Sequence, residues 1–256
     1  MIVDTFLFND EFDMLDVRLE ITKNYVDKWI ILEGDKTWSG ISKEFHLKEK
    51  IKYYNKKYNN KIELINLKIP DGYKDWVCEN FSRASLQMGI DKLQDQDIVV
   101  HSDLDEIIDP SKFQLILQEL EEKNKPISCQ LEMYIYAFNL KTARIWNGPI
   151  VAKKSMFENP QKLYKGNQPK RKDRAHCFLY PDVVGWHWTW IGDDARIKNK
   201  VISCIESQNR DPDQVLSAFK SGDTVSAINH KTSTTKVEVS YPDSVLKVLK
   251  KFPFWV

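Results

Sequence analysis

Acidic side chains gather just after one short apolar run near the middle of the chain. Residues 98–100 are Ile, Val and Val, and Asp103, Asp105 and Glu106 follow soon after them. A run this short and this rich in β-branched residues predicts a buried strand, so the acids stand where that strand ends. Asp103 and Asp105 are two residues apart and therefore point the same way in extended backbone. Two carboxylates on one side can hold Mg²⁺ or Mn²⁺, with water and phosphate as further ligands, which predicts chemistry on a nucleotide diphosphate.

The Asp-x-Asp pair also has a plainer interpretation. The same spacing occurs by chance in many solvated surface turns, and its place after a predicted buried strand is what favours a metal site. Glu106 either joins this site through a water molecule or closes the turn. A helix is expected to follow directly, with Asp109 as its N-cap and Pro110 at its first position.

Strands and helices alternate through the segments that must position these acids. Buried strands are predicted at residues 3–8, 29–33 and 62–67, and each is followed by apolar residues at helical spacing. Such alternation predicts an α/β protein, Rossmann-like, with a mainly parallel sheet flanked by helices. Ligands of such sheets bind outside the carboxyl ends of the strands, which is where the acids are expected.

The pattern changes in the C-terminal half. Residues 128–138 alternate between apolar and polar side chains, and Asn147-Gly148 between two short apolar runs predicts a hairpin. Further helices are predicted to begin at Asp193-Asp194 and at Asp211-Pro212, because Asp is a favoured N-cap and Pro is tolerated at the first helical position. We therefore expect an antiparallel extension of the sheet in this half.

The composition is that of a globular chain. Its 256 residues include 38 basic and 37 acidic ones, and a net charge of +1 argues against nucleic-acid binding, which normally needs a basic excess. The four cysteines are far apart and predict no disulfide framework. Because we find neither a transmembrane run nor a signal peptide, we expect a cytoplasmic, soluble protein. Residues 245–256 are basic and amphipathic, so they either dock on the core as a last helix or make weak contact with a membrane surface.

Four segments stand out in order along the chain, residues 8–19 (FNDEFDMLDVRL), 31–40 (ILEGDKTWSG), 101–107 (HSDLDEI) and 185–190 (GWHWTW). Together they resemble glycosyltransferase family 17, which includes the enzyme that adds the bisecting N-acetylglucosamine to N-glycans. The resemblance implies a GT-A-like fold, UDP-N-acetylglucosamine as donor, a glycan acceptor, a divalent metal (Mn²⁺ or Mg²⁺) and inversion to a β linkage. We expect one domain over residues 1–256, with about 1–125 binding the nucleotide sugar and about 126–256 binding the acceptor.

Three carboxylates at the ends of the first two strands are candidates for donor binding. Glu33 resembles the acid that many GT-A enzymes use near the uridine, and a carboxylate can accept hydrogen bonds from a base N–H or a ribose hydroxyl. Asp10 and Glu11, after the first strand, follow the same logic. Either of them can instead lie at a helix N-terminus, where negative charge is favourable.

Arg83 is expected on the helix before the acidic segment. It resembles the helix arginine that often faces the nucleotide in GT-A folds, although it can also pair with Glu79 one turn earlier. Lys36 and Trp38 follow Glu33 and can contact donor or acceptor, or form an ordinary exposed loop. The apolar face predicted for the helix of Arg83 consists of Val77, Phe81, Ala84 and Met88.

His187 lies between two tryptophans just before a predicted helix. A neutral imidazole can serve as a third metal ligand or as a general base, or it can be an ordinary core histidine. An inverting transfer needs one base for the acceptor hydroxyl, and Asp193 and Asp194 at the next helix start are further candidates. The sequence does not choose among these three residues.

Two other functions remain open from the sequence. One is a non-catalytic module that binds a glycan or a nucleotide sugar on the same fold. The other is a metal-dependent phosphoesterase or nucleotidyltransferase, although such sites usually hold two metal ions and need more ligands. The basic residues of 159–175 can reach phosphates or form a solvated loop.

Overall fold

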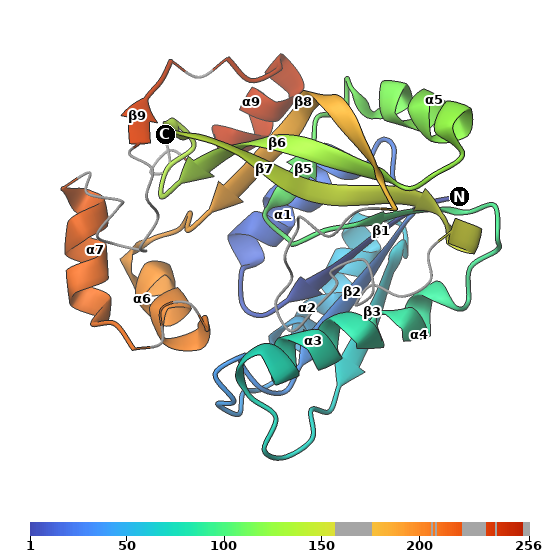
Figure 1. The fold of residues 1–256 in the computed structure, drawn as a ribbon. Coiled ribbons are helices and arrows are strands. Elements are labelled where there is room, and N and C mark those ends of the chain that lie inside the picture. The colour runs from blue at the N-terminus through green and yellow to red at the C-terminus, as the bar shows by residue number, and fades with distance from the viewer. Residues whose placement is uncertain (157–175, 206, 208, 222–233, 239, 253–256) are drawn as a thin grey trace.

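A computed structural model describes residues 1–156, 176–205, 207, 209–221, 234–238 and 240–252 (Figure 1). Within these residues, strands and helices alternate through the N-terminal half, as the apolar spacing predicts. The strands are β1 (Ile2–Phe8), β2 (Lys28–Gly34), β3 (Ile62–Leu67), β4 (Ile98–His101), β5 (Glu106–Ile108), β6 (Ile127–Ile135), β7 (Leu140–Lys153), β8 (Phe178–Thr189) and β9 (Thr234–Lys236). The helices are α1 (Phe12–Thr22), α2 (His46–Lys57), α3 (Asp75–Ser85), α4 (Gln87–Ile90), α5 (Phe113–Lys123), α6 (Asp194–Ser203), α7 (Pro212–Lys220) and α9 (Asp243–Leu249), with a 3₁₀ turn η1 (Lys154–Met156).

The N-terminal half builds a parallel sheet in the order β3-β2-β1-β4. Each strand returns through a helix, so the carboxyl ends of these strands face the same edge. The registers align Phe8 with Glu33 and Thr5 with His101, which brings the polar residues after β1, β2 and β4 to one edge of the sheet. The predicted α/β class with a mainly parallel sheet is confirmed.

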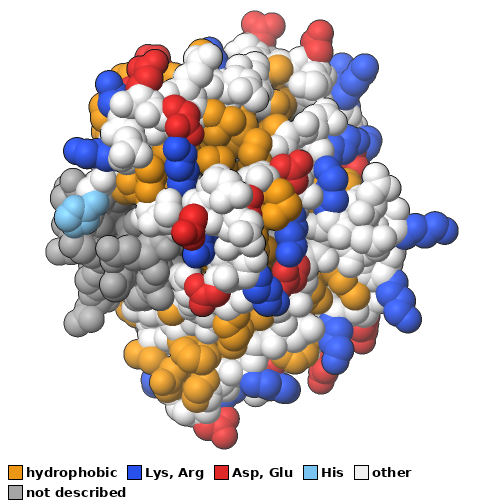
Figure 2. Space-filling model, turned by 90° about the vertical axis from the view of Figure 1, so that its right-hand side faces the viewer, with side chains coloured by type: hydrophobic (Ala, Val, Ile, Leu, Met, Phe, Trp, Pro, Cys, Tyr) orange, Lys and Arg blue, Asp and Glu red, His pale blue; other side chains and the backbone are white. Residues whose placement is uncertain are grey.

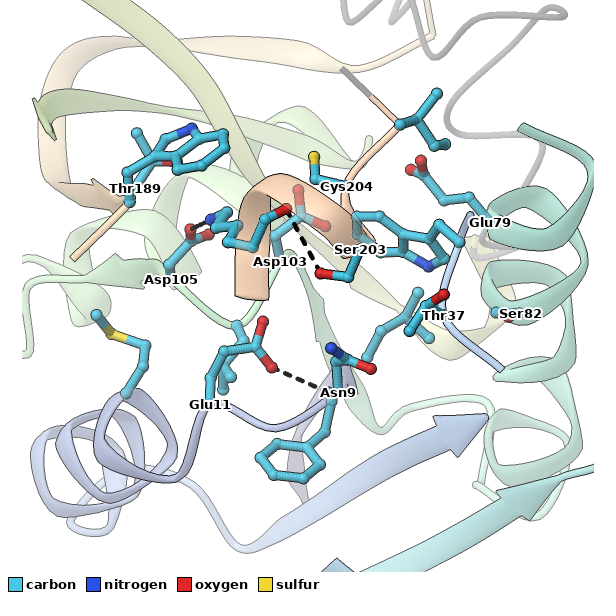
Figure 3. A pocket seen from close by; sticks show the side chains of 18 of the residues that line it. Asn9, Glu11, Thr37, Glu79, Ser82, Asp103, Asp105, Thr189, Ser203 and Cys204 are labelled. Atoms are coloured by element: carbon cyan, nitrogen blue, oxygen red, sulfur yellow. Dashed lines mark hydrogen bonds and ion pairs between the residues drawn. The ribbon is translucent and has the colours of Figure 1, made fainter. Parts of the chain in front are cut away.

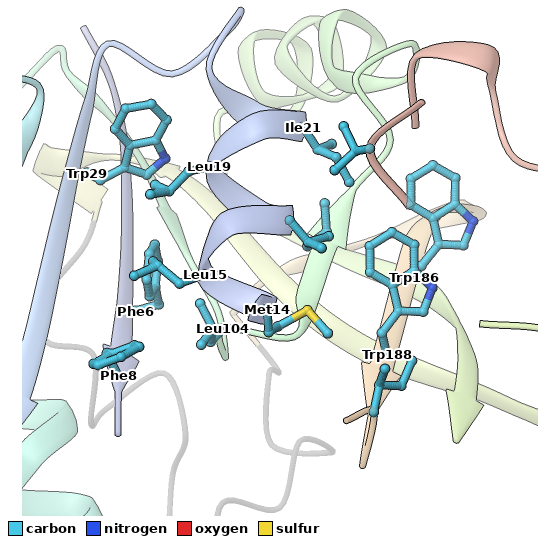
Figure 4. Close-up of a cluster of buried hydrophobic side chains, with 14 of the residues drawn as sticks. Phe6, Phe8, Met14, Leu15, Leu19, Ile21, Trp29, Leu104, Trp186 and Trp188 are labelled. Atoms are coloured by element: carbon cyan, nitrogen blue, oxygen red, sulfur yellow. The ribbon is translucent and has the colours of Figure 1, made fainter. Parts of the chain in front are cut away.

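Helices cover both faces of this parallel sheet. On one face Phe6 and Trp29 pack with α1, α2 and α9 in one buried cluster, part of which Figure 4 shows around α1. On the other face Val3, Ile30 and Leu32 pack against α3 and α4. Neighbouring residues of one strand thus belong to opposite layers, as the alternation of side chains along a strand requires. Strands buried on both faces explain the continuous apolar runs in the sequence.

The second half extends the sheet through antiparallel pairing. β7 joins β4 and carries β6 and β9, β6 pairs in parallel with β8, and β8 carries the short β5. The expected extension is present, but the hairpin predicted at Asn147-Gly148 is wrong, because both residues lie inside β7. The chain reverses between β6 and β7 instead, where Tyr136 has a φ of 71°. Gly148 serves packing: a Cβ there would lie 2.4 Å from Cδ1 of Leu131.

Two of the three predicted Asp-based helix starts agree with the structure. Asp193 caps α6, accepting from the backbone N–H of Arg196, and Asp211 caps α7 with Pro at its start. The start predicted at Asp109 is wrong, because α5 begins only at Phe113. Asp109 accepts hydrogen bonds from the backbone and side chain of Ser111, each of 2.8 Å, and so holds a turn between β5 and the helix.

The apolar face predicted for α3 is rotated in the structure. Val77 is 56% exposed and Met88, just beyond the helix, is 48% exposed, whereas Cys78 and Leu86 are fully buried. Glu79 and Arg83 form a buried ion pair on α3. The buried face of the helix therefore runs through these two residues together with Cys78.

The C-terminal helix α9 docks on the core. Val245 and Leu249 are buried against the cluster that contains α1. Residues 253–256, the end of the segment for which weak membrane contact was considered, lie outside the described residues, as do residues 159–175. Among the described residues, no helix combines the length and the apolar character that a membrane crossing requires. Acidic and basic side chains are intermixed on the face drawn in Figure 2, in keeping with their nearly equal numbers.

Candidate active site

A cavity of about 790 Å³ opens at the edge where the parallel strands end. Its lining comes from the turn after β1, the loop after β2, helix α3, the acidic segment after β4, the end of β8 and helix α6. Figure 3 shows Glu11, Thr37, Asp103, Asp105 and Cys204 around this space, although they are far apart in the sequence. A concave site of this size, at this edge of an α/β sheet, suits a ligand as large as a nucleotide.

The acidic segment rests on a buried arginine. Arg18 of α1 is 2% exposed, and its guanidinium donates to the backbone carbonyls of Asp103, Leu104 and Glu106 at 2.8, 3.1 and 2.8 Å. The same group forms a two-pronged ion pair with Asp4 of β1, at 2.6 and 2.8 Å. Burial alone would lower the pKa of Arg18, but Asp4 raises it above its usual value, so the cation is stable there. The hydrogen bonds of Arg18 thereby fix the backbone of the acidic segment.

Asp105 lies among nitrogen donors. Its carboxylate is 3.4 Å from Nε2 of His187 on β8 and 3.7 Å from the ammonium of Lys200 on α6. Burial would raise the pKa of Asp105, but His187 and Lys200 outweigh it, and the pKa lies below the usual range of a carboxyl. His187 is held by stacking on Trp146, with ring centres 4.6 Å apart. The side chain of Asp105 is therefore an anion at neutral pH.

Asp103 faces the opposite wall, so the prediction that it points the same way as Asp105 is wrong: residues 104 and 105 form a turn and not extended backbone. Nη1 of Arg83 on α3 lies 2.6 Å from its carboxylate, and Nε of Arg83 donates to Glu79 at 2.9 Å. Arg83 thus makes the expected pair with Glu79 and also lines the cavity, while its contact with a nucleotide stays a prediction. Glu106 closes the turn instead of facing the cavity: it accepts from the backbone N–H of Asp103 and from the indole of Trp146.

Asp10 and Glu11 share one cation from α6. Arg196 pairs through Nη1 with Asp10 and through Nη2 with Glu11, the latter at 2.9 Å. Burial raises the pKa of Asp10, an effect that Arg196 only partly offsets. Burial also acts on Glu11, but there Arg196 and Lys200 prevail and the pKa is lowered. Glu11 lines the main cavity, and it also accepts from the backbone N–H groups of Asn9 and Asp10.

The donor candidates at the end of β2 and in the loop after it divide into two groups. Lys36 and Trp38 line the cavity, and the ammonium of Lys36 reaches Asp71 at 2.8 Å. Glu33 is fully buried beneath them. Its carboxylate accepts from the first backbone N–H groups of α2, those of His46 and Leu47, at 2.7 and 2.9 Å, and from Lys43 at 3.0 Å. Glu33 thus holds the start of α2.

The candidates for the general base also differ in position. His187 lines the main cavity. Asp193 is not in that lining but borders a smaller cavity of about 300 Å³, which shares Glu11, Ile191 and Arg196 with the larger one. Asp194 lines neither, and its carboxylate pairs with Lys220 of α7 at 2.6 Å.

A divalent metal can be tested against the donor atoms of this site. Asp103, Asp105 and His187 offer two carboxylates and one imidazole, the donor types that Mn²⁺ accepts. Within the part of the chain that the structure describes, no three acidic, Cys or His side chains converge as a finished metal cage. Mg²⁺-type ions commonly bind through one or two carboxylates and complete their shell with water and phosphate. The adjacent donors of Asp105 and His187 fit such an open site.

Sequence reasoning missed the basic residues that organise the site. Arg18 lies within the segment 8–19, but nothing in its spacing showed that it would reach the acidic segment. Arg196 and Lys200 follow Asp193-Asp194 and are one helical turn apart, a spacing that places them on one helix face but does not show what this face meets. Because β8 pairs with β5, helix α6 after β8 comes to lie beside Asp105.

Comparisons with known proteins identify a family and a number of similar structures. A sequence model of glycosyltransferase family 17 matches residues 1–187. No match is found among curated proteins. Similar solved structures include S. aureus TarS (TM-score 0.44, 9% identity, 88% of this chain and 72% of that chain). They also include 4-diphosphocytidyl-2C-methyl-D-erythritol synthase of Anaerococcus prevotii (0.41, 12%, 72% and 86%) and galactosyltransferase LgtC with donor and acceptor sugar analogues (0.36, 14%, 64% and 62%).

Proposed function

Because the chain belongs to glycosyltransferase family 17, we propose that it transfers N-acetylglucosamine from UDP-N-acetylglucosamine to a glycan hydroxyl, with inversion at the anomeric carbon. The observation that carries the proposal is the acidic segment at the cavity: two carboxylates, one of them beside an imidazole, at the carboxyl edge of a parallel sheet. Nucleotide diphosphates carry negative charge, and this cavity also contains the cations needed to balance it.

The donor half of the cavity is lined from α3 and the loop after β2. Arg83, Lys36 and Trp38 border it, and Asp103 stands opposite Arg83. An indole can stack on a base, and the positive charge of a guanidinium attracts phosphate oxygens. We assign these residues to the nucleotide. For Glu33 we propose support of the loop after β2, since the start of α2 and Lys43 take up its oxygens.

Of the three predicted metal ligands, we propose Asp105 and His187, whose donor atoms are adjacent, as the side chains that hold a divalent cation, while Asp103 pairs with Arg83. When bound, the cation would neutralise charge on the leaving diphosphate. The protein's own contribution is to hold these side chains in position. Arg18 fixes the backbone of Asp103 and Glu106, and Trp146 fixes the ring of His187 by stacking, so that the donor atoms are oriented before any ligand arrives.

The transfer itself requires one bond to form as another breaks. The acceptor oxygen attacks the anomeric carbon while the bond from that carbon to the β-phosphate oxygen breaks, and UDP departs with the bonding pair. The proton of the acceptor hydroxyl passes to a base. Of the base candidates, we favour Asp193 over Asp194, because Asp193 borders the smaller cavity that adjoins the main one. With His187 on the metal, Asp193→Asn is expected to lower kcat far more than Asp194→Asn.

The experiment that tests this function compares sugar donors and reaction products. The protein is incubated with Mn²⁺ and UDP-N-acetylglucosamine, UDP-galactose or UDP-glucose, together with a panel of glycans, and UDP and elongated glycan are measured. Elongated glycan and UDP in equal amounts, from UDP-N-acetylglucosamine best, are the expected result. UDP binding without turnover would support a non-catalytic module, and release of uridine monophosphate would support a phosphoesterase. Either result would contradict the proposal.

A further inference from the structure

Helix α6 carries two cations, one turn apart, toward the cavity. Arg196 and Lys200 both line it, while the residues that follow each of them, Ile197 and Val201, are fully buried. The buried side belongs to a cluster with β6 and α7, so α6 is anchored by apolar packing and presents a basic stripe to the site. In Figure 1, α6 and α7 stand together beside the end of the antiparallel strands.

The two cations are engaged very differently. Two nitrogens of Arg196 are committed, one to Asp10 and one to Glu11. The ammonium of Lys200 is 3.7 Å from Asp105, which is longer than a hydrogen bond, and no hydrogen bond of this ammonium is found among the described residues. Lys200 is also 5.2 Å from the ring centre of Trp190, a weaker and undirected attraction. Lys200 therefore keeps its donors available for a ligand.

The position of Lys200 decides which ligand it suits. Its ammonium is next to the carboxylate that we assign to the cation, so it lies where a diphosphate would meet that cation. Across the cavity Arg83 is already held by Glu79 and Asp103. A lysine ammonium is a compact charge on a flexible stem, which can leave one partner for another more easily than a planar guanidinium with two fixed partners.

We propose that Lys200 is a diphosphate-binding residue: without donor it pairs with Asp105, and with donor bound it donates to the β-phosphate oxygens that become the leaving group. This inference rests on the proposed function, since it assumes a nucleotide diphosphate in the cavity. It assigns to α6 a direct role in stabilising the departing UDP. Arg196 has the separate role of fixing α6 to the turn after β1.

The test compares UDP with uridine, which lacks the phosphates. Both are titrated calorimetrically into the wild type, Lys200→Met and the control Lys198→Met, without metal and with Mn²⁺. Lys198 is on the same helix, but its ammonium pairs with Asp213 and it does not line the cavity. For Lys200→Met we expect the Kd of UDP to rise about ten- to a hundredfold, and that of uridine to stay unchanged, because only UDP loses a charge-assisted hydrogen bond. Lys198→Met should bind both as the wild type does.

A second readout separates ligand binding from damage to the site. Removing a positive charge beside Asp105 should leave the affinity for Mn²⁺ alone unchanged or tighten it, whereas a distorted site would bind Mn²⁺ more weakly. Lys200→Arg should recover part of the UDP affinity. Unchanged UDP binding in Lys200→Met, or an equal loss for UDP and uridine, would overturn the role of Lys200. If the wild type itself does not bind UDP, the proposed function fails, and this inference fails with it.

Discussion

Asp105 is the residue on which the assignment of the site depends most. It is a half-buried anion whose neighbours are an imidazole and an ammonium, and its pKa is lowered although burial acts in the opposite direction. Removing a carboxylate from water raises the free energy unless another group balances its charge. A charge kept at the end of a strand, at the edge of a cavity, is typical of a binding or catalytic group.

Replacing Asp105 tests that role directly. We expect Asp105→Asn to reduce kcat/KM for sugar transfer by about a hundredfold or more, the loss typical when one electrostatic partner of a transition state is removed. Asp95→Asn is the matched control, because Asp95 forms an exposed ion pair with Lys154 outside the cavity. Turnover of Asp105→Asn close to that of the control would refute the site. Thermal unfolding of both variants checks that the fold is retained.

Arg18 gives a prediction about the stability of the fold. Lysine keeps the positive charge but supplies three donors instead of five in a planar fork, so it cannot serve both Asp4 and the carbonyls of Asp103 and Glu106. Because the site is fully buried, we expect Arg18→Lys to lower the free energy of unfolding by about 3 kcal/mol. Urea unfolding measures this change, and a loss below about 0.5 kcal/mol, the scale of surface substitutions, would contradict it.

These residues also show where prediction from the sequence stops. Asp103 and Asp105 could be singled out because a strand and a turn place them by local spacing alone. Arg18, Arg196 and Lys200 act on residues distant in the chain, and only the assembled sheet brings them there. Spacing can indicate which helix face they occupy, but not what that face meets.

At the scale of elements, the start of α2 depends on a side chain from a neighbouring strand. Phe45 at the N-cap offers no side-chain acceptor, and Glu33 of β2 accepts from the free N–H groups instead. The negative charge also suits the positive end of the helix. Glu33 therefore couples the end of β2 to α2, which explains why a strand that is otherwise apolar ends in a buried acid.

A substitution of Glu33 separates this role from direct contact with the donor. We expect Glu33→Gln to lower the free energy of unfolding by about 2 kcal/mol, because two hydrogen bonds to a charged acceptor and an ion pair with Lys43 are weakened. The KM for the donor should change less than threefold. A normal stability combined with a large rise in KM would instead indicate that Glu33 contacts the nucleotide.

Elements with strong local signals were predicted well, and those set by distant contacts were not. The strands of the parallel sheet and the starts of α6 and α7 follow from apolar runs and Asp caps. Asn147-Gly148 is a favourable turn pair in isolation, yet β7 continues through it, because pairing with β6 on one side prevails over local preference. Similarly, β5 is only three residues long and is defined by its pairing with β8, so no periodicity could reveal it.

At the scale of the whole molecule, the architecture is a four-stranded parallel sheet that is continued by antiparallel strands. The sheet is continuous across the boundary expected near residue 125, since β4 pairs with β7. Strand pairing, and not a linker alone, therefore connects the proposed acceptor half to the proposed donor half. The division of the chain into a donor half and an acceptor half remains a prediction that substrate-bound structures can test.

Acid should weaken the contact between α1 and α2. Hydrogen bonds from Lys23, Tyr58 and Lys57 outweigh burial and lower the pKa of Glu20 from 4.5 to about 2. A carboxyl whose pKa is lowered on folding adds stability above its unfolded pKa and loses it as the pH falls through the folded value. The difference in unfolding free energy between the wild type and Glu20→Gln should be constant above about pH 5.5 and shrink from pH 4.5 to about 2. A difference independent of pH would contradict the assignment.

The most direct test of the central claim is calorimetric titration of UDP-N-acetylglucosamine into the protein, with and without Mn²⁺, repeated on Asp105→Ala. The central claim is that the acidic segment after β4 holds a nucleotide sugar through a divalent cation. It predicts binding that Mn²⁺ strengthens in the wild type and that Mn²⁺ no longer strengthens in the variant. Equal binding by the two proteins in the presence of Mn²⁺, or no binding by the wild type, would contradict it.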